Sequence, residues 1–180
     1  MKVTETKLKG CFIIEPTIFG DERGYFFESF NKEKFKKLTG KEIEFVQDNE
    51  AYSNRGVLRG LHFQIGEFAQ AKLVRVVKGK VLDVVVDLRP NSKTYGKTVS
   101  CILSEENKKQ LFVPRGFAHG YAVIEDNTVL VYKCDNYYQP TSEGGIIYND
   151  ATLNIDWMLS EDEIILSNKD KLLQSIKELR

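Results

Sequence analysis

The sequence lacks any long hydrophobic run and any excess of one charge sign. No apolar stretch approaches the roughly 20 residues needed to span a bilayer, and the run near the N-terminus, CFII, is too short for a signal-peptide core. Because 26 basic residues balance 26 acidic ones, the total charge gives no reason to expect nucleic-acid binding. A local site for an anion such as a diphosphate is compatible with this balance. We therefore expect a soluble, cytoplasmic protein.

Cysteine and histidine are scarce. Cys11, Cys101 and Cys134 are odd in number and lack CxxC spacing, which argues against a disulfide framework or a zinc ribbon and favours a reducing compartment. The only histidines, His62 and His119, lie 57 residues apart with no HxH pair, so a metal site and a metal-dependent oxygenase are disfavoured. Metal-free acid-base chemistry is still open, because a histidine titrates near neutral pH and is a natural general base.

Internal repeats, low-complexity tracts and linkers are absent, so residues 1–180 are expected to form one domain with its own core. Helical periodicity is also rare. Residues 31–38 (NKEKFKKL) predict a short helix that is capped by Asn31 and ends near Gly40. Residues 167–179 predict a second helix, because Ile and Leu recur at helical spacing with charges between them.

Between residues 45 and 138 the sequence instead predicts short strands rich in Val, Leu and aromatic residues. The strand candidates are VLRGLHFQ, AKLVRVVKG, KVLDVVVDL, KTVSCILS, QLFVP and TVLVYKCDNYY. Turn signals separate them at residues 78–79, 90–92, 105–107 and 125–127. This pattern is typical of an all-β sandwich or barrel with short peripheral helices, and we expect a barrel.

Strand alternation brings several polar residues onto faces that should be apolar, because side chains two residues apart share a face. Lys72 shares its face with Val74 and Val76, so it is either an interior cation or a lysine whose ammonium group extends past the strand end. The other polar residues expected on such faces are Glu28 (with Phe26), Gln47 and Asn49 (with Phe45), His119 (with Phe117 and Tyr121), and Tyr132 and Tyr138 (with Leu130). Along residues 81–88, one face is expected to carry Leu82, Val84, Val86 and Leu88, and the other Asp83 and Asp87 with Val81 and Val85.

The segment GVLRGLHFQ, residues 56–64, contains the most informative polar pair. Strict alternation would place Arg59 and His62 on opposite faces of a strand. Gly60 lies between them, and a glycine inside a strand often marks a bulge that redirects a side chain. We infer a kink at Gly60 that lets both side chains point inward; the alternative is a surface Arg59 with a His62 in the core.

Eight segments follow one another in an order that is similar to that of a known family. They are RGYFFE (23–28), QDN (47–49), GVLRGLHFQ (56–64), KLVRVVKG (72–79), DVVVDLR (83–89), VPRGFAHGYAV (113–123), YKCDNYY (132–138) and LSNKD (166–170). In this set the sequence resembles the dTDP-4-dehydrorhamnose 3,5-epimerases of the cupin superfamily, from about Gly10 to Asp170. The resemblance implies a cupin-type jelly-roll barrel that forms a homodimer with strand exchange.

The same resemblance implies a reaction. Members of the family invert C3 and C5 of dTDP-4-dehydro-6-deoxy-D-glucose, next to the C4 ketone, and give dTDP-4-dehydro-L-rhamnose. His62 matches the family's base, and Asp170 matches the carboxylate that orients it. Lys72 matches the cation beside the developing oxyanion, and Tyr132 matches the proton donor on the opposite face. No NAD, metal or pyridoxal cofactor is implied.

Other residues match positions that bind the substrate. Arg59 and Arg23 match contacts to the diphosphate, for which the guanidinium fork is suited. Tyr138 matches the aromatic residue that stacks on thymine. The remaining matches to substrate contacts are Glu28, Gln47, Asn49, His119, Glu143 and Lys169. Because the RGYFFE segment reaches into the partner's barrel in the family, Arg23 and Glu28 are expected to serve the neighbouring subunit.

Several positions depart from the family's usual pattern. They are Ala51, the loop 65–70 (IGEFAQ), Tyr148, Ala151, Met158 and Gln174. None of them is a predicted catalytic residue, but they concern loops around the sugar, so inversion of one centre instead of two stays open. Three further alternatives are an enzyme acting on another nucleotide sugar, a sugar-nucleotide 3,4-ketoisomerase, and a non-catalytic sugar-nucleotide-binding protein of the same fold. The intact His62, Lys72, Tyr132 and Asp170 argue against the last one.

Overall fold

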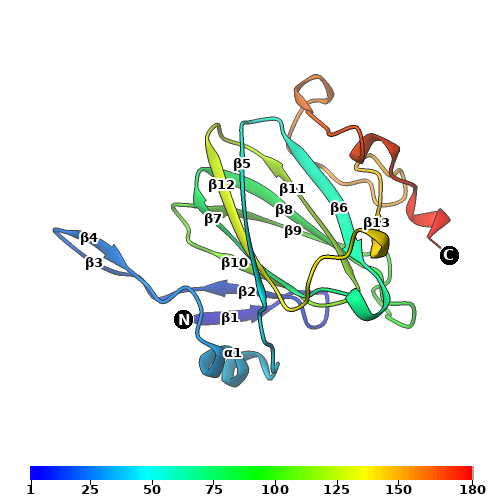
Figure 1. Ribbon diagram of the computed structural model, residues 1–180. Helices are drawn as coiled ribbons and strands as arrows, with labels where there is room; N and C mark the ends of the chain where they lie inside the picture. The colour runs from blue at the N-terminus through cyan, green and yellow to red at the C-terminus, as the bar shows by residue number, and fades with distance from the viewer. Residues whose placement is uncertain (180) are drawn as a thin grey trace.

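The computed structural model describes residues 1–179 and shows two large antiparallel sheets and one projecting hairpin (Figure 1). The six-stranded sheet has the order β1 (Lys2–Glu5), β2 (Phe12–Glu15), β10 (Gln110–Val113), β7 (Lys72–Lys78), β12 (Thr128–Cys134) and β5 (Gln47–Ser53). The five-stranded sheet has the order β13 (Glu143–Gly145), β6 (Leu58–Gln64), β11 (Phe117–Val123), β8 (Lys80–Asp87) and β9 (Thr98–Ser104). The prediction of an all-β fold is therefore confirmed.

The main core lies between these two sheets and explains the alternation along β8. Val81 and Val85 belong to a buried cluster with Val74, Val76 and Leu130 of the six-stranded sheet. The alternate β8 residues Leu82, Val84 and Val86 pack in a second cluster with the C-terminal third of the chain, including Ile146, Trp157 and Ile176. Asp83 and Asp87 share this interior face of β8 with Val81 and Val85, so the predicted grouping by alternation is confirmed, and the structure shows which face is interior.

The short helix α1 (Lys32–Thr39) is also confirmed, with both predicted caps. The Asn31 side chain accepts a hydrogen bond from the Lys34 backbone N–H at 3.0 Å. Gly40 ends the helix in the left-handed conformation, with φ of 68°. The helix is anchored by Phe35, which packs against Phe12 and Phe112 at one edge of the six-stranded sheet.

The second predicted helix, residues 167–179, is wrong. The segment contains two 3₁₀ turns, η4 (Asp170–Leu172) and η5 (Ile176–Glu178), with extended chain between them. There the Gln174 carbonyl accepts a hydrogen bond from the Ile147 N–H at 2.9 Å. This pairing with the rest of the fold overrides the local helical pattern. The other 3₁₀ turns are η1 (Gly66–Phe68), η2 (Pro140–Ser142) and η3 (Glu161–Glu163).

Two predicted strand ends are also too long. β5 begins at Gln47, after Phe45, and β12 ends at Cys134, so Tyr138 lies in the following loop and not on the strand that carries Tyr132. Strand β4 (Gly24–Phe26) lies within the segment 23–28 that was treated as a strand but ends before Glu28, whereas β1, β2, β3 (Phe19–Asp21) and β13 were not predicted.

The hairpin of β3 (Phe19–Asp21) and β4 (Gly24–Phe26) extends away from the barrel, at the left of Figure 1. Its aromatic residues are unusually exposed, with Phe19 at 63%, Tyr25 at 60% and Phe26 at 70%. Apolar side chains on a projecting two-stranded hairpin are typical of a surface that contacts another molecule. All three cysteines are free, and none of the helices in residues 1–179 has the length and apolar character that crossing a membrane requires.

Candidate active site

Two adjoining cavities, of about 350 and 530 Å³, open into the barrel between β5, β12 and β7 on one side and β6 on the other. They share three lining residues, His62, Lys72 and Tyr132. Eleven of the predicted site residues line one cavity or both: Gln47, Asn49, Arg59, His62, Lys72, His119, Tyr132, Tyr138, Glu143, Lys169 and Asp170. Residues from distant parts of the sequence are thus brought together.

A bulge at Gly60 lets β6 present both Arg59 and His62 to this space. Arg59 pairs with Tyr121 and His62 with His119, so the register between β6 and β11 shifts by one residue. Gly60 has φ of 109°, and a Cβ there would lie 2.7 Å from the His119 carbonyl oxygen. Only glycine fits this conformation and this close approach, so the predicted kink is confirmed.

His62 is bound to a buried carboxylate. Its Nε2 lies 2.5 Å from Oδ1 of Asp170, which is carried into the barrel by turn η4. The Ser167 hydroxyl donates to the other carboxylate oxygen at 2.9 Å, which fixes the orientation of Asp170. With Nε2 engaged, Nδ1 is the ring nitrogen left to accept a proton. Burial lowers the pKa of His62 below its ordinary value, against the opposing effect of Asp170, and so favours the neutral imidazole that a base requires.

Lys72 and Tyr132 come from neighbouring strands of the opposite sheet. The Lys72 ammonium lies 5.8 Å from the centre of the Tyr132 ring. Burial lowers the pKa of Lys72, while the nearby Cys134, Asp83 and Glu143 raise it. Burial also raises the pKa of Tyr132, which keeps its hydroxyl protonated at neutral pH. The cavity therefore has a largely neutral imidazole on one wall and a protonated phenol on the other.

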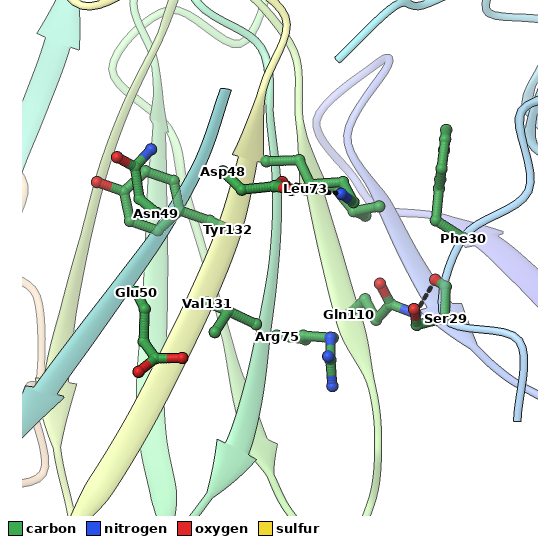
Figure 2. A pocket seen from close by; sticks show the side chains of 11 residues that line it. Ser29, Phe30, Asp48, Asn49, Glu50, Leu73, Arg75, Gln110, Val131 and Tyr132 are labelled. Atoms are coloured by element: carbon green, nitrogen blue, oxygen red, sulfur yellow. Dashed lines mark hydrogen bonds and ion pairs between the residues drawn. The ribbon is translucent and has the colours of Figure 1, made fainter. Parts of the chain in front are cut away.

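Asn49 lies on the same cavity wall as Tyr132. The two are register partners in β5 and β12, and Figure 2 shows their side chains close together on this sheet. Gln47 donates to the Asn49 carboxamide oxygen at 3.0 Å, and Asn49 donates to the Cys134 sulfur at 3.7 Å. These contacts orient a row of carboxamides toward the cavity.

A chain of polar contacts lies at the mouth of the 350 Å³ cavity. The Tyr138 hydroxyl donates to Oε2 of Glu143 at 2.5 Å, and Lys169 forms an ion pair with the same carboxylate. The Tyr138 N–H is held by the Gln47 carboxamide oxygen at 3.1 Å. Tyr138 is nonetheless half exposed, so its ring is free to stack on a planar ligand.

Arg23 and Glu28 are the two predicted site residues that the structure does not bring to the cavity. Arg23 lies on the projecting hairpin, where it forms an ion pair with Asp21. Glu28 accepts from Asn31 and forms an ion pair with Lys34 of α1. Neither position can contribute to the site of the same subunit in this arrangement.

Sequence reasoning missed three residues that support the site. Ser167 and Cys134 lie within the quoted segments LSNKD and YKCDNYY, but no role was predicted for them. Asp83 was grouped with Val81 and Val85 on one face of its strand, and a carboxylate beside two valines was the signal that could have identified it. It accepts two hydrogen bonds from His119 Nε2, each 3.0 Å long. Within residues 1–179, no three His, Cys, Asp or Glu side chains are grouped so that they could hold a metal ion.

Comparisons with known proteins agree on one family. Residues 5–178 match the family model described as dTDP-4-dehydrorhamnose 3,5-epimerase. The chain is 50% identical to the Escherichia coli K12 enzyme of that name, over 99% of this chain and 96% of the relative.

Solved structures show the same similarity. One is dTDP-4-dehydrorhamnose 3,5-epimerase from Elizabethkingia anophelis, with TM-score 0.95, 54% identity, and coverage of 99% and 97% of the two chains. Another is dTDP-6-deoxy-D-glucose-3,5-epimerase from Legionella pneumophila in complex with dTDP-4-keto-L-rhamnose, with TM-score 0.95, 46% identity, and coverage of 99% and 94%. Fold, cavity and sequence therefore agree, and this chain belongs to the dTDP-4-dehydrorhamnose 3,5-epimerase family of cupin-type barrels.

Proposed function

We propose that the protein inverts C3 and C5 of dTDP-4-dehydro-6-deoxy-D-glucose and forms dTDP-4-dehydro-L-rhamnose, a step of L-rhamnose biosynthesis. The observation that supports this most strongly is the placement of His62 and Tyr132. They come from different sheets and line the same two cavities, with His62 paired to Asp170. A base and an acid on facing walls are what inversion at a carbon centre requires.

The reaction needs no external oxidant or reductant. His62 removes the proton from the carbon next to the ketone, and the electron pair of the broken C–H bond moves to the C4 oxygen to form an enolate. Lys72 stabilises the negative oxygen, an interaction that is strongest in a site shielded from water. Tyr132 then donates a proton to the opposite face of the carbon; its phenolate is reprotonated from solvent, and the protonated His62 releases its proton to solvent. Repeating the sequence at the second carbon completes the conversion.

Binding of the nucleotide is assigned to the remaining residues. Arg59 lines the larger cavity and contacts the diphosphate, while Tyr138 stacks on thymine at the mouth of the smaller one. Gln47, Asn49, His119, Glu143 and Lys169 supply further polar contacts.

We infer that Arg23 and Glu28 act in the site of a partner subunit in a homodimer. The projecting hairpin supports this inference, because it exposes Phe19, Tyr25 and Phe26 and keeps Arg23 away from the cavity of its own chain. Exchange of the two hairpins would cover these apolar side chains and add a second guanidinium to each site. A cytoplasmic location is proposed from the composition.

Isotope exchange tests the proposed reaction. The protein is incubated with dTDP-4-dehydro-6-deoxy-D-glucose in D₂O, and NMR determines which carbons take up deuterium. Uptake at both C3 and C5 with formation of the L-rhamnose precursor is expected, and uptake at one carbon alone would show a single-centre epimerase. Full activity after exhaustive chelation is also expected, and recovery of a lost rate by added zinc, iron or manganese would refute metal independence.

A further inference from the structure

Asp83 is a buried carboxylate with very few partners. It lies on the interior face of β8 beside Val81 and Val85, and its exposure is 0%. Among the described residues, His119 alone donates hydrogen bonds to its side chain, through Nε2 to both oxygens at 3.0 Å. Asp83 does not line the cavity, whereas His119 does. Asp83 therefore acts on the site through a residue that lines it, His119.

Asp87, on the same face of the same strand, shows what a structural carboxylate in this barrel looks like. It accepts five hydrogen bonds, from the backbone N–H, Nε and Nη2 of Arg89 and from the hydroxyls of Ser92 and Thr94, at 2.6 to 3.0 Å. These bonds tie the loop after β8 to the strand. Asp83 has no such role, because it is bound to no loop and to no backbone group.

A buried carboxylate is costly unless positive groups compensate it. His119 compensates Asp83 by direct hydrogen bonds. Lys72 does so through its charge, because the nearness of Asp83 raises the pKa of Lys72 against the effect of burial.

The charges that act on the pKa of Lys72 come from three elements: Cys134 on β12, Asp83 on β8 and Glu143 on β13. Tyr132 on β12 and His62 on β6 line the cavity beside it. Of the two carboxylates in this set, Glu143 is already engaged by Lys169 and Tyr138. Asp83, by contrast, is bound within residues 1–179 by His119 alone.

We propose that Asp83 is a positioning residue of the epimerisation, which holds the His119 ring through Nε2 and places a negative charge near Lys72, where the enolate oxygen forms. This role rests on the proposed function. It makes Asp83–His119 a second aspartate–histidine pair in the barrel, distinct from the His62–Asp170 base. Because Nε2 of His119 is occupied, Nδ1 is the nitrogen that the ring presents to a ligand.

The test is the pH dependence of Asp83→Asn, which keeps the size of the side chain and removes its charge. The value of kcat should fall about 10- to 100-fold, as it does when an outer partner that orients a directly acting group is lost. The alkaline limb of the pH–kcat profile should move to lower pH, because Lys72 loses its proton more easily without the nearby anion. The acid limb, set by His62, should stay in place.

Asp87→Asn is the matched control, from the same strand and the same face. It should lower the unfolding midpoint but leave both limbs of the profile where they are. If Asp83→Asn likewise lowers stability and leaves kcat and the alkaline limb unchanged, Asp83 is only structural and the proposal is wrong. Absence of deuterium exchange by the unaltered protein would instead overturn the proposed function, and the role of Asp83 with it.

A second measurement decides the matter if Asp83→Asn does not fold. The protein has only two histidines, so ¹⁵N-histidine labelling of the native chain gives spectra of two imidazoles, assigned with His62→Asn. Nε2 of His119 should carry a proton across the active pH range. An unprotonated Nε2 would exclude the hydrogen bond to Asp83 on which the proposal depends.

Discussion

His62 and His119 are register partners on β6 and β11, and each is bound through Nε2 to a buried aspartate from a different part of the chain. The two pairs differ in access: the His62 side chain is 26% exposed, whereas that of His119 is 6% exposed. The open pair lies across the cavity from Tyr132 and suits proton transfer. The buried pair suits the positioning of charge.

Asp170→Asn should slow deuterium exchange less than removal of the histidine base, because the imidazole is still present but is poorly oriented. We expect a loss of about 10-fold or more in the exchange rate, below the 10²- to 10⁴-fold typical of an acid or base. Asp150→Asn is the control, since Asp150 is a buried aspartate that caps backbone N–H groups of Leu153 and Ile176. It should reduce stability and leave the exchange rate of the folded protein unaltered. An equal effect of both variants on exchange would contradict the assigned role of Asp170.

The acid limb of the pH–rate profile should lie below pH 6.5. Burial lowers the pKa of His62 from its ordinary value of 6.5, so the neutral base persists to lower pH before protonation stops the reaction. In Asp170→Asn the limb should move lower still, because the carboxylate that raises the pKa of His62 is gone. Initial rates of exchange between pH 4.5 and 8 locate the acid limb of the unaltered protein and that of Asp170→Asn. An acid limb above pH 6.5 in the unaltered protein would contradict the assignment of His62 as the base.

Gly60→Ala should damage both stability and activity. At φ of 109° an added Cβ would meet the His119 carbonyl oxygen at 2.7 Å, so the bulge that directs Arg59 and His62 inward must shift. We expect a loss of about 1 to 3 kcal/mol in the free energy of unfolding, measured with urea, together with weaker dTDP binding. Gly20→Ala, where the nearest atom is 3.6 Å away and φ is not in the left-handed range, should change little. Equal stability of the two variants would show that the bulge tolerates a side chain.

Mixed dimers test the exchange of the hairpin. If Arg23 serves the partner's site, Arg23→Ala and His62→Ala subunits should each be impaired alone. When mixed, they should form some dimers with one intact site, and activity should reappear. Absence of any recovery, with subunit mixing verified by mass spectrometry, would show that each site is built from one chain.

Much of the barrel could be predicted because its strands alternate strictly and end at clear turn signals. The Gly60 kink could be predicted from the local sequence, since a glycine inside a strand, here between Arg59 and His62, often marks a bulge that redirects a side chain. The C-terminal segment could not, because its conformation depends on pairing with Ile146 and Ile147, far away in the sequence. The same holds for the position of Tyr138, which follows the end of β12.

Some site residues could be predicted from the local sequence, and others could not. His62, Lys72 and Tyr132 sit on regular strands, so alternation together with the family resemblance located them. Asp170 required the resemblance alone, since turn η4 carries it into the barrel. The contact between Asp83 and His119 could not be predicted, because it depends on the register of β8 against β11, which the local sequence does not set. In that register Asp83 lies opposite Tyr121, and His119 reaches it from two residues away on the same strand.

The most direct test of the account compares deuterium uptake with epimerised product in His62→Asn and Tyr132→Phe. Without the base no enolate forms, so His62→Asn should lose uptake and inversion together, by about 10²- to 10⁴-fold or more. Without the acid, His62 can still remove a proton and return one from solvent to the same face. Tyr132→Phe should therefore keep measurable uptake and lose most of the epimerised product. The reverse pattern, with uptake retained in His62→Asn and abolished in Tyr132→Phe, would contradict the assignment of base and acid.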